Sequence, residues 1–430
     1  MGTAPEFIVS TPYPEATISA IARAAARSDR LKAFYTTLLI PAWAKRLADH
    51  MPPSSLQRAI SRELKRRSFG PLEAGRVTTV ATISELEHLI ARRIPGAPKA
   101  AAANRMYKVK ADFDSAVALR LSAENQIASG DVVVGMYAAA ALTFEAAARK
   151  GAIKALQFVN GHPEFHNGQL KRFAELADDH HEIVPKHVAL RVSAELDRAD
   201  VVLVPSRLVA GQLRDRGVPA DRLIVEPYGI DTDKFRPVPK PITQPNKAIR
   251  CLYVGQISFR KGIAILLEAA RQLSSDLVEF RLIGPLVSPE VLRRLPPTVR
   301  WSASMPQSEL VAELSGCDIF VLPSLEDAYP LVTLEAMACA APVIVTDCAG
   351  TSELITNGSD GFVVKAGSVE SLVVAIRRLA RDEELRRSVG ANARVRIEST
   401  NSWEEYGCRI VQRLADATEG ASLRNRVRSK

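Results

Sequence analysis

Two acidic residues, Asp327 and Glu335, lie eight positions apart in a segment whose pattern suits ligand binding. The apolar run 319–322 predicts a buried strand before them, and the stretch 331–339 predicts a helix that carries Glu335. In a parallel sheet, the loop between a strand and the following helix lies at the carboxyl edge, where ligands bind. Backbone amides at the start of that helix suit a phosphate or an electron-rich sugar oxygen. We therefore expect both carboxylates and these amides to face one crevice.

A second segment, 252–268, combines a strand, a glycine turn, two cations and a helix. Its sequence is LYVGQISFRKGIAILLE, in which Arg260 and Lys261 directly precede Gly262. Cations and amides that follow a parallel strand and precede a helix form a natural cradle for a diphosphate. No G-x-G-x-x-G or Walker sequence follows any apolar run, which counts against NAD and ATP as ligands.

The acidic segment resembles the donor-binding motif of family 4 glycosyltransferases, which are retaining enzymes of the group 1 type with the GT-B fold. That motif has two acids with seven residues between them, then a helix of small residues and a Pro-Val strand. Here Asp327 takes the first acidic place, where the family usually has Glu, and Glu335 takes the second. The resemblance implies that Asp327 contacts hydroxyls of the transferred sugar and that Glu335 holds the ribose of the nucleotide. Glu353 matches another recurrent acid of the family.

The cation segment resembles the part of the family that grips the donor diphosphate. Lys261 and Gly262 match, but Gln256 stands where the family usually has Arg. A glutamine cannot neutralise charge, so either Arg260 replaces the missing cation or diphosphate binding is weakened. The predicted donor-binding residues are Gly255, Gln256, Arg260, Lys261, Tyr329, Pro330, Leu331, Val332 and Glu335. The resemblance places the nucleotide base near Gly284, Ser304, Met305 and Pro306.

The resemblance also implicates a histidine in the first half of the chain. His162 follows the apolar run 155–159, at a place where the family often has a His that reaches toward the transferred sugar. The predicted catalytic residues are therefore Lys261, Asp327 and His162, with a hydrogen-bonded loop histidine as the alternative for His162. Pro163 is expected to keep His162 and His166 from forming a metal pair on a regular helix, so no metal site and no cofactor are predicted.

The first strand shows a departure from the family that concerns the acceptor. In the family this strand leads into a Gly-Gly loop, whereas here it leads into Glu15-Ala16. Without those glycines the loop must take another shape, so the acceptor cannot be carried over from the resemblance.

Apolar runs that alternate with helical stretches predict an α/β fold with parallel, doubly wound sheets. The predicted strands are 7–10, 77–83, 132–134, 155–159, 201–204 and 223–225, then 250–254, 280–283, 299–302, 319–322, 343–345 and 362–364. The segment 236–247 contains four prolines and predicts a linker. We expect two Rossmann-like domains facing a central cleft, the GT-B arrangement: an acceptor-binding domain, 1–238, and a donor-binding domain, 248–402. The helix 403–420 is expected to pack back onto the first domain, and the region 84–130 shows no clear pattern.

The chain has 430 residues and a net charge of +9, which is unevenly distributed. Residues 1–110 hold 18 Lys and Arg against 8 Asp and Glu, a balance of +10, and the remainder is at −1. A basic first domain favours an anionic partner such as a membrane surface, and the segments 31–50 and 56–70 mix apolar and basic residues as an interfacial helix does. A solvated basic face on a core helix is the alternative, and no nucleic acid partner is predicted.

The remaining composition favours a cytoplasmic protein. No run reaches ~18 apolar residues, so no membrane-spanning helix is expected. The N-terminus shows no charged-then-apolar signal peptide, and the 5 cysteines are scattered without any C-x-x-C pair, as in a reducing compartment. We expect a protein that lies in the cytoplasm or at the inner face of the cell membrane.

On the resemblance we predict a retaining hexosyltransferase that moves a sugar from a nucleotide diphosphate sugar to a glycan or lipid-linked acceptor, in surface polysaccharide or glycolipid assembly. Such transfer needs the leaving diphosphate to be stabilised and an oxocarbenium-like centre to be held beside the acceptor hydroxyl. Two alternatives stay open within enzymes: a transferase with a soluble acceptor, and a nucleotide-sugar epimerase on the same fold. A third is a catalytically weak partner protein, which Gln256 and the Asp at 327 would favour.

Overall fold

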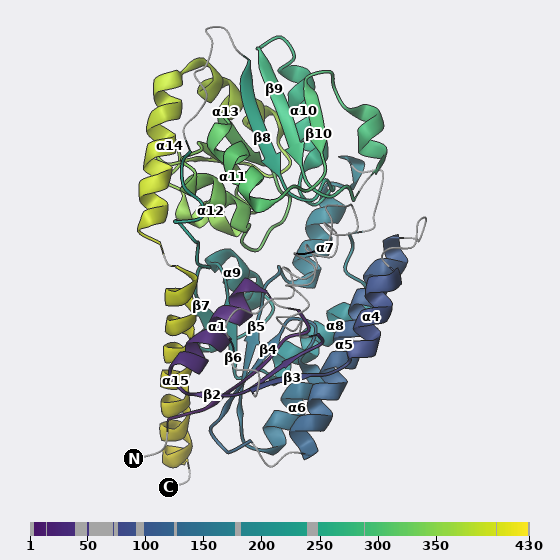
Figure 1. Cartoon of the computed structure of the whole chain (residues 1–430), viewed down its shortest axis with the longest axis vertical. Coiled ribbons are helices and arrows are strands. Elements are labelled where there is room, and N and C mark those ends of the chain that lie inside the picture. Colours follow the sequence, from purple (N-terminus) through teal and green to yellow (C-terminus); the bar gives the residue numbers. More distant parts are fainter. Residues whose placement is uncertain are drawn as a thin grey trace.

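The computed structural model describes residues 4–13, 15–38, 50, 72, 76–91, 99–123, 127–176, 182–238, 248–287, 289–400 and 402–428. Within these ranges the chain forms two parallel sheets, one from β1–β7 and one from β8–β13, each with helices on both faces (Figure 1). The predicted α/β fold with two doubly wound sheets is confirmed.

The N-terminal sheet has the strand order β3-β2-β1-β4-β5-β6-β7, and every pair is parallel. Its strands are β1 (Phe7–Ser10), β2 (Leu31–Thr36), β3 (Val77–Thr79), β4 (Val132–Met136), β5 (Ile153–Gln157), β6 (Val201–Val204) and β7 (Leu223–Val225). Its helices are α1 (Ala16–Arg27), α4 (Thr82–Ala91), α5 (Lys99–Ala123), α6 (Ala141–Arg149), α7 (Pro163–Arg172), α8 (Lys186–Arg198) and α9 (Arg207–Arg214). The order of the strands reverses between β1 and β4, so a crevice opens beyond their carboxyl ends.

The C-terminal sheet has the order β10-β9-β8-β11-β12-β13. Its strands are β8 (Ile249–Val254), β9 (Val278–Ile283), β10 (Val299–Ser302), β11 (Ile319–Leu322), β12 (Val343–Thr346) and β13 (Phe362–Val364). Its helices are α10 (Ile263–Gln272), α11 (Gln307–Gly316), α12 (Leu331–Ala338), α13 (Val369–Arg381) and α14 (Glu383–Glu398). Here the order reverses between β8 and β11, so the loops after these two strands face each other across a crevice. The segments 255–262 and 323–330 are these two loops, and they hold the predicted donor residues Gly255, Gln256, Arg260, Lys261, Tyr329 and Pro330.

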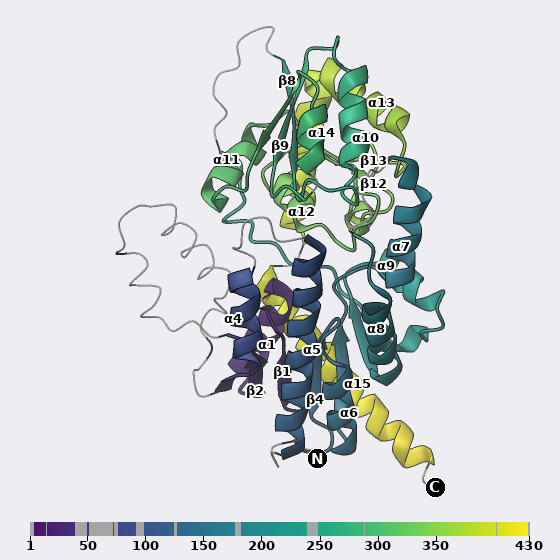
Figure 2. The ribbon, with the colours of Figure 1, turned by 90° about the vertical axis from the view of Figure 1, so that its right-hand side faces the viewer.

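The last helix, α15 (Trp403–Arg428), leaves the C-terminal sheet and lies along α1 of the N-terminal one (Figures 1 and 2). Gly407 permits this close approach, because a β-carbon there would overlap the carbonyl oxygen of Ala20. Arg409 and Arg413 both bond the carboxylate of Glu226, at 2.9 and 3.0 Å. Helix α15 therefore packs against the N-terminal half and is held there by ion pairs.

Three expectations for the N-terminal half differ from the structure. The predicted strand 77–83 ends at Thr79, because Ala81 adopts a left-handed conformation with φ 55° and α4 begins at Thr82. The region 84–130, which shows no pattern in the sequence, contains most of α4 and all of α5.

The third difference concerns the segment 31–50, which was a candidate for membrane contact. Its first part, Leu31–Thr36, is the buried strand β2 between β1 and β3, so these residues do not face a membrane. Residues 39–49 and 56–70 lie outside the described part of the chain. No helix in the described part is long and apolar enough to span a membrane.

Candidate functional site

The two loops at the crevice of the C-terminal sheet are joined by close backbone contacts. Gly262 precedes α10 with φ 73°, and a β-carbon there would overlap the carbonyl oxygen of Pro323. The backbone N–H of Leu325 donates to the carbonyl of Arg260 at 2.8 Å. These contacts fix the relative position of the cation loop and the acidic loop, and they explain why the motif needs glycine after its lysine.

This arrangement brings Lys261 and Asp327 together as an ion pair between Nζ and Oδ2. Their side chains are 14% and 11% exposed, respectively. Burial lowers the pKa of Lys261, and Arg260 lowers it further, whereas Asp327 opposes both. A buried cation of this kind gains strongly from an anionic ligand, provided that the Asp327 carboxylate moves aside.

Arg260 lies beside this pair but is already engaged with two other carboxylates. Its NH1 atom donates to the backbone carbonyl of Glu326 at 3.0 Å and lies 3.6 Å from the Glu326 carboxylate. Its backbone N–H donates to the carboxylate of Glu182 at 2.7 Å. Burial alone would lower the pKa of Arg260, but these carboxylates outweigh burial and raise it. Arg260 is thus a permanent cation whose charge is largely balanced within the protein.

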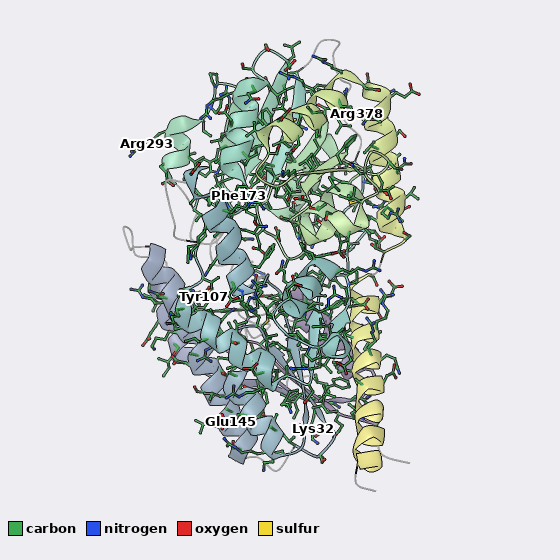
Figure 3. The ribbon with its side chains drawn as sticks, turned by 180° about the vertical axis from the view of Figure 1, so that it is seen from behind. Lys32, Tyr107, Glu145, Phe173, Arg293 and Arg378 are labelled. Atoms are coloured by element: carbon green, nitrogen blue, oxygen red, sulfur yellow. The ribbon has the colours of Figure 1, made fainter. Side chains whose placement is uncertain are left out.

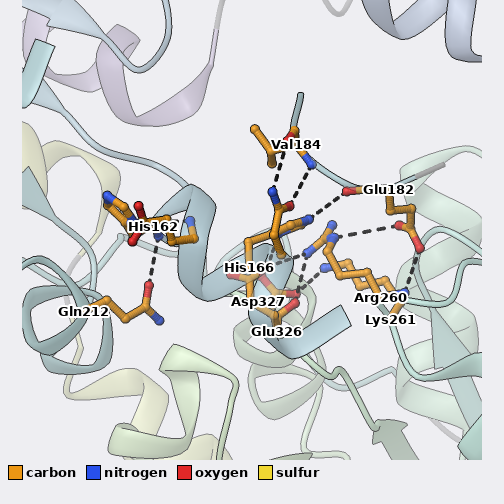
Figure 4. A network of polar contacts seen from close by, with 11 residues as sticks. His162, His166, Glu182, Val184, Gln212, Arg260, Lys261, Glu326 and Asp327 are labelled. Carbon is orange, nitrogen blue, oxygen red and sulfur yellow. Dashed lines mark hydrogen bonds and ion pairs between the residues drawn. The ribbon is translucent and has the colours of Figure 1, made fainter. Parts of the chain in front are cut away.

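The same network reaches into the N-terminal half of the molecule (Figure 4). His166 of α7 lies 2.9 Å from the Glu326 carboxylate through Nδ1 and 2.8 Å from the Glu182 carbonyl through Nε2. A β-carbon at Gly161 would collide with the same carboxylate of Glu326. Burial raises the pKa of Glu326, but His166 and Arg260 outweigh it and hold that pKa below its usual range. Glu326 is therefore an ionised bridge between the two halves.

His166, Glu182 and Glu326 were not predicted as site residues. They are 16 to 160 positions from their partners in the chain, so no local spacing reveals them. Pro163 is the first residue of α7, and His162 is its N-cap with an extended backbone, so the two histidines do not both lie on the helix. His166 does follow His162 by one turn, but its ring bonds Glu326 and Glu182. Within the described residues no group of three His, Cys, Asp or Glu could hold a metal ion.

His162 caps the N-terminus of α7. Its Nδ1 atom accepts a hydrogen bond from the backbone N–H of Glu164 at 3.2 Å. The backbone N–H of His162 donates to the side-chain oxygen of Gln212 at 2.9 Å. Burial lowers the pKa of His162 to about 4, with a further contribution from Arg216. The imidazole is therefore neutral near pH 7, and since Nδ1 accepts, the proton lies on Nε2. His162 can donate one hydrogen bond to a ligand.

Helix α12 begins directly after the acidic loop. Pro330 is its N-cap and has no backbone N–H, and the N–H of Thr333 donates to the Pro330 carbonyl at 3.0 Å. The N–H groups of Leu331 and Val332 have no partner within the helix and point out of its N-terminus. The ring of Tyr329 packs edge-on against Tyr228 of the N-terminal half, with 5.3 Å between the ring centroids.

Glu335 lies four residues into α12, about 6 Å along the helix axis from Leu331. It is half-buried, and no hydrogen bond of its carboxylate is found within the described residues. Burial raises the pKa of Glu335 to about 7, and Lys234 opposes that rise. The carboxylate is therefore able to accept new hydrogen bonds.

The residues expected around the nucleotide base lie at the ends of β8, β9 and β10. Gly284, with φ 150°, packs against the carbonyl oxygen of Gly255, where a β-carbon would not fit. The Nε1 atom of Trp301 donates to the carbonyl of Gly284 at 3.1 Å, and the side chain of Gln256 is exposed. Beyond them, Ser304 and Pro306 are exposed and Met305 is half-buried.

Glu353 lies apart from these residues. Its carboxylate accepts from the backbone N–H groups of Arg207 and Leu208, at 2.9 and 2.5 Å, at the start of α9. An acid from the C-terminal half therefore caps a helix of the N-terminal half.

Comparisons with known proteins agree with this geometry. Residues 235–396 match the family described as Glycosyl transferases group 1. The chain is 28% identical to the putative colanic acid biosynthesis glycosyltransferase WcaL of Salmonella typhimurium, over 46% of the chain and 52% of that protein. It is 30% identical to the N,N'-diacetylbacillosaminyl-diphospho-undecaprenol alpha-1,3-N-acetylgalactosaminyltransferase of Campylobacter jejuni, over 42% of the chain and 51% of that protein. The chain thus spans about half the length of these relatives.

Solved structures cover almost the whole chain at low identity. The sucrose-phosphate synthase of Thermosynechococcus elongatus has a TM-score of 0.66 at 18% identity, over 97% of this chain and 100% of that one. Anabaena HepE in complex with UDP has a TM-score of 0.63 at 16% identity, over 96% of this chain and 100% of that one. At such identities the likeness concerns the fold. The chain has the GT-B fold, and its residues 235–396 are similar to the group 1 glycosyltransferases.

Proposed function

We propose that this protein transfers a hexose-type sugar from a nucleotide diphosphate sugar to a hydroxyl of a glycan or lipid-linked acceptor, with retention at the anomeric carbon. The observation that carries the proposal is the contact between Lys261 and Asp327 at the crevice of the C-terminal sheet. A cation for the leaving diphosphate and an acid for the sugar hydroxyls lie side by side there. His162 belongs to the N-terminal half, whose α7 contacts the same acidic loop through His166.

In the proposed reaction, the bond between the anomeric carbon and the diphosphate oxygen breaks while the acceptor oxygen bonds the same face of that carbon. Lys261 and the N–H groups of Leu331 and Val332 stabilise the negative charge that develops on the diphosphate. Asp327 leaves Lys261 and accepts hydrogen bonds from the sugar hydroxyls, and His162 donates to the sugar through Nε2. The proton of the acceptor hydroxyl passes to the departing diphosphate, so no protein nucleophile and no metal are needed.

Arg260 contributes to this site mainly through its position. The carboxylates of Glu326 and Glu182, 3.6 and 3.9 Å from its guanidinium, balance its charge, so it does not fully replace the Arg that the family has at the position of Gln256. Diphosphate binding then depends on Lys261 and on the amides of α12. This makes Lys261 more important here than in a site with two unpaired cations.

The acceptor class is supported by the names of the relatives, which refer to colanic acid biosynthesis and to a diphospho-undecaprenol substrate. The basic balance of residues 1–110 supports a cytoplasmic protein that associates with an anionic membrane surface. Flotation with liposomes that contain anionic lipid tests the membrane part, and no binding at low salt would contradict it.

A panel of nucleotide sugars tests the function itself. A bound donor stabilises the folded state by RT ln(1+[L]/Kd), about 2.7 kcal/mol at a 100-fold excess over Kd, so thermal unfolding identifies the donor. Release of the nucleotide and analysis of the product, with and without acceptor, then follow. A product that forms only with acceptor supports transfer, whereas conversion of the donor sugar without acceptor indicates the epimerase.

Replacing Glu335 by Gln is expected to weaken binding of the donor and to stabilise the folded protein. The amide retains one hydrogen-bond acceptor for the ribose hydroxyls but has no charge, so we expect Kd for the donor to rise about tenfold or more. Burial raises the pKa of Glu335 to about 7 in the folded protein, so ionisation destabilises the fold as pH rises from about 4.5 through 7. Glu335→Gln should therefore raise the free energy of unfolding by about 1–2 kcal/mol at pH 8 and by little at pH 4.

The measurements for this prediction are calorimetric titration with the donor and chemical unfolding at both pH values. Glu279→Gln is the matched control, because Glu279 is an exposed residue of β9 in the same sheet. Equal donor affinity in Glu335→Gln and in the control would remove Glu335 from the site.

A partner protein without turnover remains a second candidate, because Gln256 is not cationic and Arg260 is balanced by acids. Under that alternative, Glu335→Ala would leave the biological activity intact.

A further inference from the structure

A separate cavity lies in the N-terminal half, between α5 and α8. Its volume is about 260 Å³. It is lined by Asn104, Tyr107, Lys108, Ala111, Ala138, His187, Val188 and Arg191. Ala138 lies two residues after the end of β4, one of the two strands between which the order of the N-terminal sheet reverses. The cavity therefore lies at the ligand-binding edge of this sheet.

The lining is rich in hydrogen-bond donors. Asn104, Tyr107, Lys108 and Ala111 occupy one face of α5 by their spacing, and His187 and Arg191 lie one turn apart on α8. Burial raises the pKa of Tyr107, so its hydroxyl keeps its proton. Two permanent cations, a histidine, an amide and a phenol thus surround the cavity, and its lining contains no carboxylate. This donor set suits an anion.

The acids nearest to the two cations lie outside the lining. Asp114 bonds Arg191 at 2.8 Å, but its carboxylate also accepts from the N–H groups of Leu142 and Thr143 at the start of α6. Because that carboxylate is shared with a helix N-terminus, it fixes Arg191 while balancing only part of its charge. Lys108 lies 3.2 Å from Asp112, and its side chain is 63% exposed, so this ion pair is weak.

The cavity is connected to the donor site through a short segment. Glu182 accepts a hydrogen bond from the backbone N–H of Arg260 and lies five positions before His187. Five residues span at most ~17 Å, so the cavity lies within reach of the donor loop. In Figure 3, Tyr107 lies at the end of the N-terminal half that faces the C-terminal half, whereas Glu145 lies at the far end.

We propose that this cavity binds a phosphate group carried by the acceptor. The inference rests on the proposed function and deepens it, because it assigns the acceptor to the class of phosphorylated compounds. The cavity is smaller than a site for a drug-sized molecule but holds a phosphate group with the first atoms of its ester substituent. Arg191 provides a fixed guanidinium, and Lys108, His187 and Asn104 complete the shell of donors.

The test is calorimetric titration with glycerol 1-phosphate, using the whole chain. In the double variant Lys108→Ala/His187→Ala, we expect the Kd for glycerol 1-phosphate to rise about tenfold or more, because two hydrogen-bond donors to the phosphate are lost. Arg149→Ala is the matched control. Arg149 is also 63% exposed and also pairs with an acid one turn away, but it lies on α6 with Glu145 at the far end of the domain. The Kd of Arg149→Ala for glycerol 1-phosphate should equal that of the unmodified protein.

The source of the phosphate is distinguished by a second ligand. Vesicles of phosphatidylcholine that contain phosphatidylglycerol are compared with soluble glycerol 1-phosphate. If the double variant binds the vesicles more weakly, the phosphate belongs to a lipid headgroup. If it binds only glycerol 1-phosphate more weakly, the phosphate belongs to a soluble ester. Equal binding of both probes by the double variant and by Arg149→Ala would overturn the proposal. So would equally tight binding of an uncharged glycoside in place of glycerol 1-phosphate.

Two further measurements keep the test interpretable. If the double variant unfolds, Lys108→Gln, which removes the charge but keeps most of the side chain, should weaken binding of glycerol 1-phosphate in the same direction. Nucleotide binding is measured separately. If the protein binds no nucleotide, the proposed function fails, whereas the phosphate titration still reports on this cavity alone.

Discussion

Replacing Lys261 by Ala is expected to lower kcat/KM for sugar transfer about 100- to 1000-fold, because removal of one preorganised donor to a developing anion has this effect in other enzymes. Lys261 is the cation that contacts Asp327, and Arg260 cannot fully substitute for it while the carboxylates of Glu326 and Glu182 lie 3.6 and 3.9 Å from its guanidinium. The measurement is the rate of nucleotide release at saturating acceptor over a range of donor concentrations. Binding of a nucleoside diphosphate should weaken in parallel.

The matched control for this variant is Lys154→Ala. Lys154 is also 14% exposed and also pairs with an aspartate, Asp200, at 2.8 Å, but it lies on β5 of the N-terminal sheet. Its replacement should cost some stability and leave transfer unchanged once the folded fraction is taken into account. Comparable rates in the two variants would show that Lys261 has no special role at the diphosphate.

Replacing Gly262 by Ala is expected to destabilise the C-terminal half by about 3 kcal/mol or more and to abolish donor binding. The left-handed conformation costs a residue with a β-carbon about 1–2 kcal/mol. In addition, that β-carbon would overlap the carbonyl oxygen of Pro323, so the two loops would have to separate. Because Lys261 and Asp327 lie on these loops, their contact would be lost. Thermal unfolding and donor titration measure the two effects.

Gly358→Ala is the control that separates the strain of a left-handed backbone from the overlap of a β-carbon with Pro323. Gly358 also has a positive φ of 83°, but a β-carbon there would meet nothing within 4 Å. This control should lose only about 1–2 kcal/mol and keep its affinity for the donor. If both variants lose the same stability and Gly262→Ala still binds the donor, the close approach of the two loops is not what positions the site.

The fold could be predicted because its strands are unusually clear in the sequence. Parallel strands covered on both faces appear as short continuous apolar runs, and β1, β6, β10, β11 and β13 match their predicted ranges. β2 was missed, because Lys32 and the basic segment after it suggested a surface element. Its lysine is accommodated by ion pairs with Glu6 and Asp131, which the sequence does not reveal.

The site in the C-terminal half could be predicted in part, since its residues lie within two short motifs at the ends of strands. Lys261 and Asp327 are in contact, and the amides of Leu331 and Val332 begin α12 nearby. The positions and roles of His162 and Glu335 as ligand contacts stay predictions. Pro330, one of the predicted donor residues, offers no amide at the helix start, and its residue type alone shows this because proline has no backbone N–H.

The contacts between the two halves could not be predicted. Glu326 directly precedes Asp327 and looks like an ordinary loop acid, yet it is 3% exposed and bonds His166 of α7. Such pairs depend on how two sheets meet, which no periodicity encodes. The role of Arg260 follows from the same contacts, so the sequence left open whether Arg260 replaces a cation at Gln256.

The decisive test of this site is a crystal structure with a nucleoside diphosphate such as UDP. We expect the terminal phosphate to lie within hydrogen-bonding distance of Lys261 Nζ and of the N–H groups of Leu331 and Val332. The ribose hydroxyls should contact Glu335, and Asp327 should have left Lys261. A nucleotide bound elsewhere, with the Lys261–Asp327 pair unchanged, would contradict this expectation.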